Sequence, residues 1–156
     1  AWYLPVIGAS VEVRGVDAVV ARLQRVALRI GNRRIPNKEV SVVLFAEVMR
    51  NFDAEAHEGK PWAPLAPATV KGKEKKGYAR ILQNTGALRN SFLPFSDADV
   101  AGVGARSVKK HADISTVHEY GAPERNIPAR PMLPSRLTAE RIALKVYELY
   151  VERSIK

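Results

Sequence analysis

The sequence contains no cysteine, which excludes disulfides and thiolate metal sites. This suits a reducing compartment such as the bacterial cytoplasm. Histidine occurs three times, at His57, His111 and His118. None of these has the i, i+4 partner of a helical zinc motif, so we expect no metal. No apolar run approaches the roughly 18 residues of a membrane span, so we expect no membrane contact.

The chain also lacks the common catalytic patterns. Without cysteine there is no thiol nucleophile, and no Gly-x-Ser-x-Gly elbow marks out any of the serines. Neither standard Gly-rich phosphate loop is present, and Gly102-Val103-Gly104 fits a strand end better. We therefore predict that the protein is not an enzyme and binds no cofactor. A metal-dependent hydrolase that uses His118 or Asp113 is a weaker alternative.

Positive charge is what the sequence has in excess. It holds 25 Lys and Arg against 16 Asp and Glu, a formal net charge of +9. This balance favours an acidic partner such as nucleic acid or an acidic protein face. The densest basic segment, residues 71–80, contains Lys71, Lys73, Lys75, Lys76 and Arg80. We expect a loop there that faces a partner, or that lines a ring through which DNA passes and contacts only the phosphate backbone.

A length of 156 residues suits one domain with its own core. We expect residues 1–9 to form an N-terminal arm and residues 10–156 a single domain. Residues 10–14 alternate polar and apolar, which predicts a short strand. From Val16 to Ile30 apolar residues recur at helical spacing, with arginines on the opposite face. A second helix should open near Pro36, and its wide apolar arc predicts burial on more than one side.

The second half alternates irregular segments with short elements. Proline and glycine interrupt every pattern from about 58 to 84, which predicts a long irregular central loop. The elements expected after it are a helix entry with Thr85 as N-cap, strands at 91–95 and 100–103, a helix ending before Gly121, an extended segment at 122–134 and a helix from Ser135. Together these elements predict an α+β fold, a small antiparallel sheet packed by the N-terminal and C-terminal helices.

The last expected helix carries two apolar lines. One line, from Ala139 to Tyr150, suits a core. Leu144, Tyr147 and Val151 lie off that line, so we expect a second packing surface, such as a neighbouring subunit. A helix buried within its own subunit explains these three residues equally well.

Four landmarks stand in order between residues 59 and 134. They are Pro61-Trp62-Ala63-Pro64-Leu65 with Thr69; Ile81-Leu82-Gln83-Asn84-Thr85-Gly86-Ala87-Leu88-Arg89-Asn90-Ser91; Val103-Gly104; and His118-Glu119-Tyr120-Gly121 leading to Ile127-Pro128-Ala129-Arg130-Pro131-Met132-Leu133. Their order and spacing resemble the phage virion morphogenesis family, also called the tail-completion family, which has members in Mu-like phages. Met132 stands where that family usually has phenylalanine, which keeps apolar bulk at the position.

The resemblance implies a structural virion protein at the phage head–tail junction, forming a ring that completes the tail or joins it to the capsid connector. Such a protein would assemble in the cytoplasm of the host bacterium. Its partners would be copies of itself, in a hexamer or dodecamer, and other neck, connector or tail proteins. The alternative is a basic domain that binds nucleic acid without sequence specificity.

Trp62, Leu65 and Arg130 join Leu144, Tyr147 and Val151 as candidate assembly contacts. Trp and Arg are enriched at interface hot spots, and Arg130 between two prolines could offer a bidentate fork to a carboxylate. An equally good interpretation is that Trp62 and Arg130 hold their own loops in place.

Overall fold

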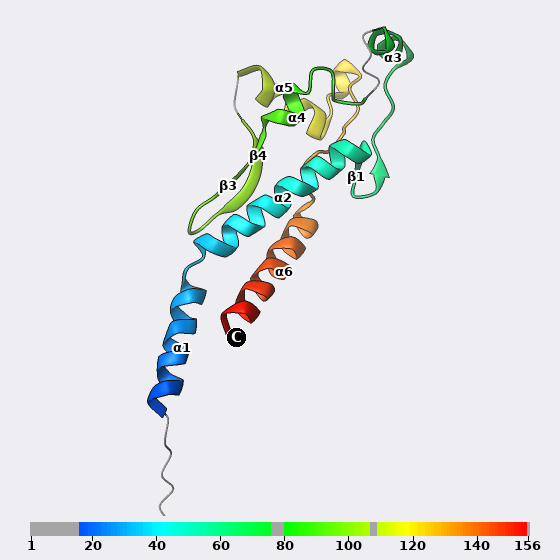
Figure 1. Cartoon of the computed structure of the whole chain (residues 1–156). Helices are drawn as coiled ribbons and strands as arrows, with labels where there is room; N and C mark the ends of the chain where they lie inside the picture. The colour runs from blue at the N-terminus through cyan, green and yellow to red at the C-terminus, as the bar shows by residue number, and fades with distance from the viewer. Residues whose placement is uncertain (1–15, 76–79, 107–108, 156) are drawn as a thin grey trace, which may run out of the picture.

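The computed structural model describes residues 16–75, 80–106 and 109–155 (Figure 1). The predicted arm at 1–9, the predicted strand at 10–14 and Lys76 lie outside these residues. The elements in chain order are α1 (Val16–Gly31), α2 (Arg34–Ala54), β1 (Ala56–His57), β2 (Lys60–Pro61), α3 (Pro67–Glu74), α4 (Ala87–Ser91), β3 (Phe92–Ser96), β4 (Ala101–Ala105), α5 (Lys109–Tyr120), the 3-10 helix η1 (Pro123–Arg125) and α6 (Arg136–Ile155). Helices and two antiparallel hairpins make the fold α+β, as predicted.

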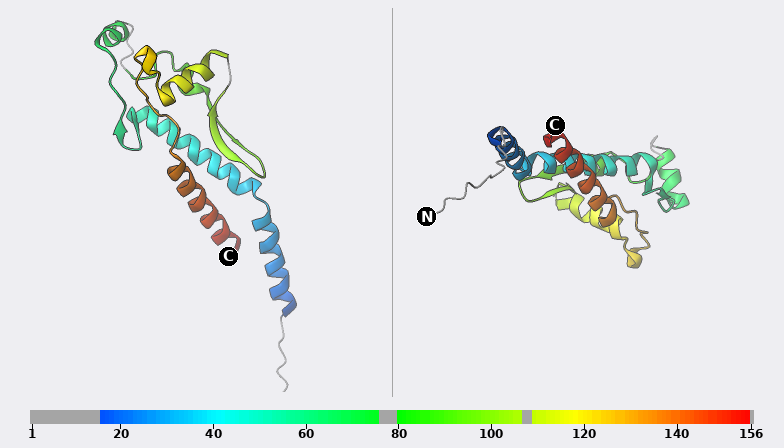
Figure 2. Two further views of the ribbon diagram at one scale, coloured as in Figure 1. Left: turned by 180° about the vertical axis from the view of Figure 1, so that it is seen from behind. Right: turned by 90° about the horizontal axis from the view of Figure 1, so that it is seen from below.

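Helix α2 is the central element of the described chain. Figures 1 and 2 show it between the β3–β4 hairpin and α6, and it contacts both. Its buried apolar residues are divided between two clusters, whereas Val42 and Val43 of the wide arc are exposed, so the predicted burial is met only in part. The first cluster comprises Val48, Phe52, Trp62, Leu88, Phe92 and Met132. The second comprises Val40, Leu44 and Val146.

The β3–β4 hairpin covers one side of α2. Its register pairs Phe92 with Ala105 and Ser96 with Ala101, within two residues of the predicted strands. The Asp97 carboxylate accepts the amide N–H groups of Asp99 (2.7 Å) and Val100 (2.9 Å), which closes the predicted turn. A side chain at Gly102 would collide with the ring of Phe95, so Gly102 belongs to a strand whose cross-strand neighbour lies over it.

The predicted irregular loop at 58–84 is wrong in part, because this segment contains β2 and the helix α3. Pro67 is the first residue of α3, where its missing N–H leaves no hydrogen bond unmade. Lys71 and Lys73 therefore lie in the last turn of a helix, where positive charge is favoured, and Lys75 caps it. Proline count alone predicted a loop because it ignores the position of each proline.

Helix ends in the second half follow local chemistry. Gly86, with φ of 75°, is the N-cap of α4, so the prediction of Thr85 as N-cap is wrong by one residue. The Thr85 hydroxyl still accepts the N–H of Ala87 at 3.3 Å. Gly121 ends α5 with φ of 78°, as expected. Helix α6 starts within one residue of the predicted Ser135, whose hydroxyl accepts the amide N–H of Thr138 at 3.3 Å.

Candidate assembly interface

An extended segment, residues 130–135, passes through the first cluster. Proline excludes helix here, so its backbone groups need partners other than a helical ladder. The amide of Asn51 in α2 donates to the carbonyl of Met132 (3.0 Å), and the indole N–H of Trp62 donates to the carbonyl of Pro131 (2.8 Å). Side chains that are distant in the sequence therefore provide the hydrogen bonds that these backbone carbonyls lack.

Helix α5 supplies partners for the amide side of the same segment. One carboxylate oxygen of Glu119 accepts the N–H groups of Met132 (2.7 Å) and Leu133 (3.2 Å). Directly after α5, Gly121 lies so close to the backbone of Ala129 that a Cβ at Gly121 would be 2.8 Å from the amide nitrogen of Ala129. The His-Glu-Tyr-Gly motif therefore holds the proline-rich motif in place, and only glycine fits at its end.

Arg130 and Trp62 are each 5% exposed and belong to the interior of their own subunit. The Arg130 guanidinium donates to the carbonyls of Ala63 (2.8 Å) and Pro64 (3.0 Å), and its burial lowers its pKa. The structure therefore favours the interpretation in which both residues hold their own loops. Leu65, one residue beyond this contact, is half-buried.

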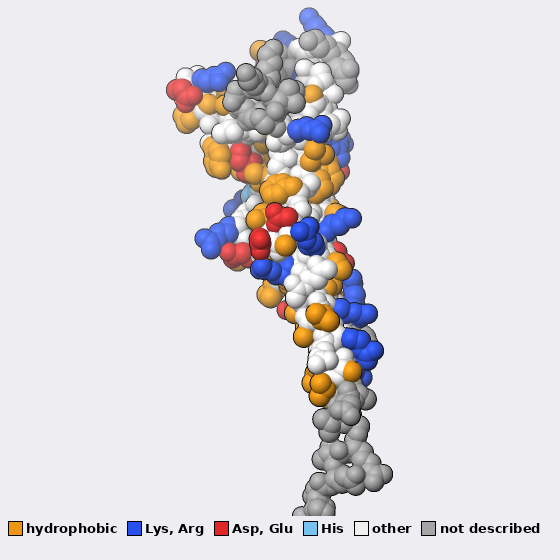
Figure 3. All heavy atoms as spheres, turned by 90° about the vertical axis from the view of Figure 1, so that its left-hand side faces the viewer, with side chains coloured by type: hydrophobic (Ala, Val, Ile, Leu, Met, Phe, Trp, Pro, Cys, Tyr) orange, Lys and Arg blue, Asp and Glu red, His pale blue; other side chains and the backbone are white. Residues whose placement is uncertain are grey.

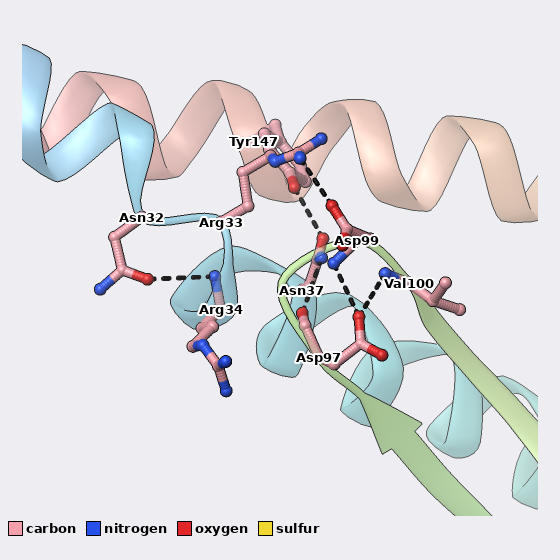
Figure 4. A network of polar contacts seen from close by, with 8 residues as sticks. All are labelled: Asn32, Arg33, Arg34, Asn37, Asp97, Asp99, Val100 and Tyr147. Atoms are coloured by element: carbon pink, nitrogen blue, oxygen red, sulfur yellow. Dashed lines mark hydrogen bonds and ion pairs between the residues drawn. The ribbon is translucent and has the colours of Figure 1, made fainter.

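The three residues of the predicted second packing surface on α6 differ in how far they are buried. The Tyr147 hydroxyl donates to the side-chain oxygen of Asn37 (2.6 Å), so Tyr147 lies inside the subunit (Figure 4). Figure 4 also shows Asn37 joined to Asp97 at the hairpin tip, which connects α6, α2 and the β3–β4 turn. Leu144 is 63% exposed and Val151 is half-buried. Of the three residues, Leu144 is the one that a neighbour could still cover extensively.

Helix α1 has an exposed apolar face, and the sequence predicted its amphipathicity but not what covers it. Four large side chains of one stripe are exposed: Val19, Val20, Leu23 and Ile30. Figure 3 shows hydrophobic side chains along this helix beside a row of Lys and Arg. The contacts of α1 with α6 include two made by its arginines: the Tyr150 hydroxyl donates to the carbonyl of Arg29 (2.6 Å), and the Arg22 guanidinium donates to the carbonyl of Ile155 (2.7 Å). Most of the stripe is therefore available to a partner.

A second apolar surface lies between α2 and α6. Val42, Val43 and Leu149 line a hollow of about 390 Å³ there, and both valines are exposed. Arg153 and Glu39 pair across its rim at 3.5 Å. This groove is wide and apolar with a charged border, which is the general form of a helix-binding groove.

A family model described as the phage virion morphogenesis family matches residues 11–149. The chain belongs to the phage virion morphogenesis family. No curated protein and no solved structure matches it. Membership gives the protein a structural or assembly role in the phage virion. The match extends well beyond the landmarks at 59–134 and includes α1, α2 and most of α6.

In this virion morphogenesis protein the basic residues at 71–80 do not form one uniform loop. Lys71 in α3 and Lys75, which caps it, are exposed, whereas Lys73 is half-buried and donates to the carbonyl of Arg80. The guanidinium of Arg80 lies 3.9 Å from the carboxylate of Asp53. Their role toward a partner or a DNA-filled lumen stays a prediction.

Two further findings concern the described residues only. Among residues 19–75, 80–106 and 114–155, no three His, Asp or Glu side chains are grouped so that they could hold a metal ion. None of the helices in the described part of the chain is both long enough and apolar enough to cross a membrane.

Proposed function

We propose that this protein is a ring-forming structural component of the head–tail junction, which completes the tail or joins it to the capsid connector. The observation that carries the proposal is the exposed apolar stripe of α1. A single helix of this length is marginal in water, so its stability requires packing of that stripe. Its own subunit contacts α1 mainly on another side, and a neighbouring subunit is the natural cover.

The two apolar surfaces differ, which argues for a closed ring. A contact between the α1 stripe of one subunit and the α2–α6 groove of the next is heterologous, and heterologous contacts form rings when the rotation closes. A hexamer or dodecamer is the expected copy number. The other partners would be neck, connector or tail proteins, with DNA passing through the lumen. The ring needs no catalysis, and we expect no turnover that depends on His118 or Asp113.

Native mass spectrometry of the Leu23→Asp variant tests the ring. Leu23 lies in the stripe and is 63% exposed, so a charge there should leave the subunit folded and abolish the ring. Leu28→Asp is the matched control, because Leu28 is 77% exposed on the opposite side of the same helix. Equal loss of oligomer in both variants, or a monomeric wild type, would reject the proposal.

Immunogold labelling of intact virions tests the location. Label at the head–tail junction is the expected result. Label elsewhere on the particle would keep the virion role and remove the neck assignment.

A second candidate function, binding of nucleic acid without sequence specificity, is favoured by the net charge and by three arginines on α1, Arg22, Arg25 and Arg29. Binding through phosphates should weaken by orders of magnitude between about 50 and 200 mM salt. A ring built on apolar contacts should persist over that range.

A further inference from the structure

The signature motifs meet around a groove beside α3. One hollow of about 370 Å³ lies between α3, the chain before α4, and α5. A second hollow of about 510 Å³ continues along residues 126–128. The two share four lining residues, namely Leu65, Thr69, His118 and Arg130. They therefore form one groove with those residues at its middle.

The groove combines positive charge with an apolar wall. Lys73 and Arg130 supply the charge, His118 is a further lining residue, and none of the described lining residues is acidic. Outside the lining, the charge of Glu55 acts on Lys73. The wall consists of Leu65, Leu82, Leu88 and Ile114. An anion with apolar neighbours complements both features.

His118 has an unused polar atom at this site. Its Nδ1 is buried and has no hydrogen-bond partner among residues 16–75, 80–106 and 109–155. An unpaired buried polar atom is energetically unfavourable, so it calls for an explanation. Burial and the charge of Arg130 lower the pKa of His118, and burial lowers the pKa of Lys73. A carboxylate in the groove would stabilise the charged forms of Lys73 and His118.

We propose that this groove binds an extended segment of another virion protein in which an acidic side chain lies between apolar residues. The carboxylate accepts hydrogen bonds from the ammonium of Lys73 and the imidazole of His118. Arg130 already donates to two carbonyls and contributes its charge. The apolar neighbours of the acid pack against Leu65 and Leu82. This site is independent of the α1 stripe, so it does not depend on ring formation.

Fluorescence anisotropy with a labelled synthetic peptide of alternating leucine and glutamate tests the site. The matched peptide has glutamine in place of glutamate. We expect the glutamate peptide to bind at least about tenfold more tightly, because hydrogen bonds to charged groups are the stronger ones. Lys73→Gln should remove most of that difference. Lys71→Gln, an exposed lysine on the same helix, should change binding less than about twofold.

NMR titration of the histidine rings gives the second readout. Binding of the glutamate peptide should raise the pKa of His118, so affinity should increase as pH falls from 8 toward 5.5, while glutamate stays largely ionised. The other charged groups near this site are Lys73, Arg130, Glu55 and Glu119, the residue that follows His118. A pKa of His118 that does not move would overturn the assignment.

The other possible outcomes of these experiments also test the proposal. Equal binding of the two peptides, or equal losses in the Lys71 and Lys73 variants, would overturn the proposal. Inorganic phosphate or duplex DNA that displaces the peptide at lower concentration would assign the groove to a phosphate and not to a peptide. Thermal melting of each variant shows whether a loss of binding reflects a loss of fold.

Discussion

The segment at 130–135 and the helix α1 differ in how they are held: the segment is anchored by tertiary contacts, and the helix by its own internal hydrogen bonds. The segment has no regular ladder, yet its backbone is fixed by Asn51, Trp62 and Glu119. Helix α1 has a complete internal ladder, yet most of its apolar stripe is exposed. Regular secondary structure and tertiary anchoring are therefore separate properties, and local stability depends on the second. The irregular segment should be the more stable region of an isolated subunit.

Met132→Ala tests the stable side of this comparison and should have the largest effect. Met132 is 0% exposed inside the first cluster, so the change leaves a cavity and should lower the free energy of unfolding by about 2–5 kcal/mol. Leu23→Ala on α1 should cost less than about 0.5 kcal/mol in the monomer. Urea unfolding measures both. Similar losses of unfolding free energy in the two variants would show that the segment at 130–135 is no more firmly anchored than α1.

Gly121→Ala should have the next largest effect. Its φ of 78° and the close approach of Ala129 both oppose a side chain, so we expect a loss above about 2 kcal/mol. Gly59→Ala separates the two causes, because Gly59 has φ of 81° but open space around it, and should cost about 1 kcal/mol. If both variants unfold at the same urea concentration, the close contact at Gly121 contributes nothing.

The pH dependence of Glu58 should give the smallest effect. Hydrogen bonds from Thr138 and Ser135 lower the pKa of Glu58 from 4.5 to about 2. Because the folded-state pKa is the lower one, this contribution to stability is present above pH 4.5 and is lost as pH falls toward 2. Glu58 is exposed, so solvent screening keeps the contribution small. Melting temperatures of wild type and Glu58→Gln should differ at pH 7 and converge near pH 2.

Elements governed by local chemistry were predictable from the sequence. The periodicity of α2, the Asp97 turn and the glycine after α5 are encoded within a few residues. Helix α3 was missed because Pro67 was counted as a breaker although it stands at the first position. The roles of Trp62, Arg130 and Tyr147 depend on partners 69, 66 and 110 residues away, which no local pattern contains. The groove around His118 was missed for the same reason, since its walls come from four separate segments.

The break between α1 and α2 allows the direction of α1 to be set separately from that of α2. Arg33 in this break pairs with Asp99 of the hairpin tip at 2.8 Å, and Tyr150 holds the carbonyl of Arg29. Helix α1 is about 24 Å long at 1.5 Å per residue, and Arg22 within it also donates to the carbonyl of Ile155 (2.7 Å). A rotation of α1 by about 10° about the break between α1 and α2 would move the N-terminal end of α1 by about 4 Å. An exposed ion pair contributes little energy, so Arg33 and Asp99 steer the direction of α1 more than they stabilise the fold.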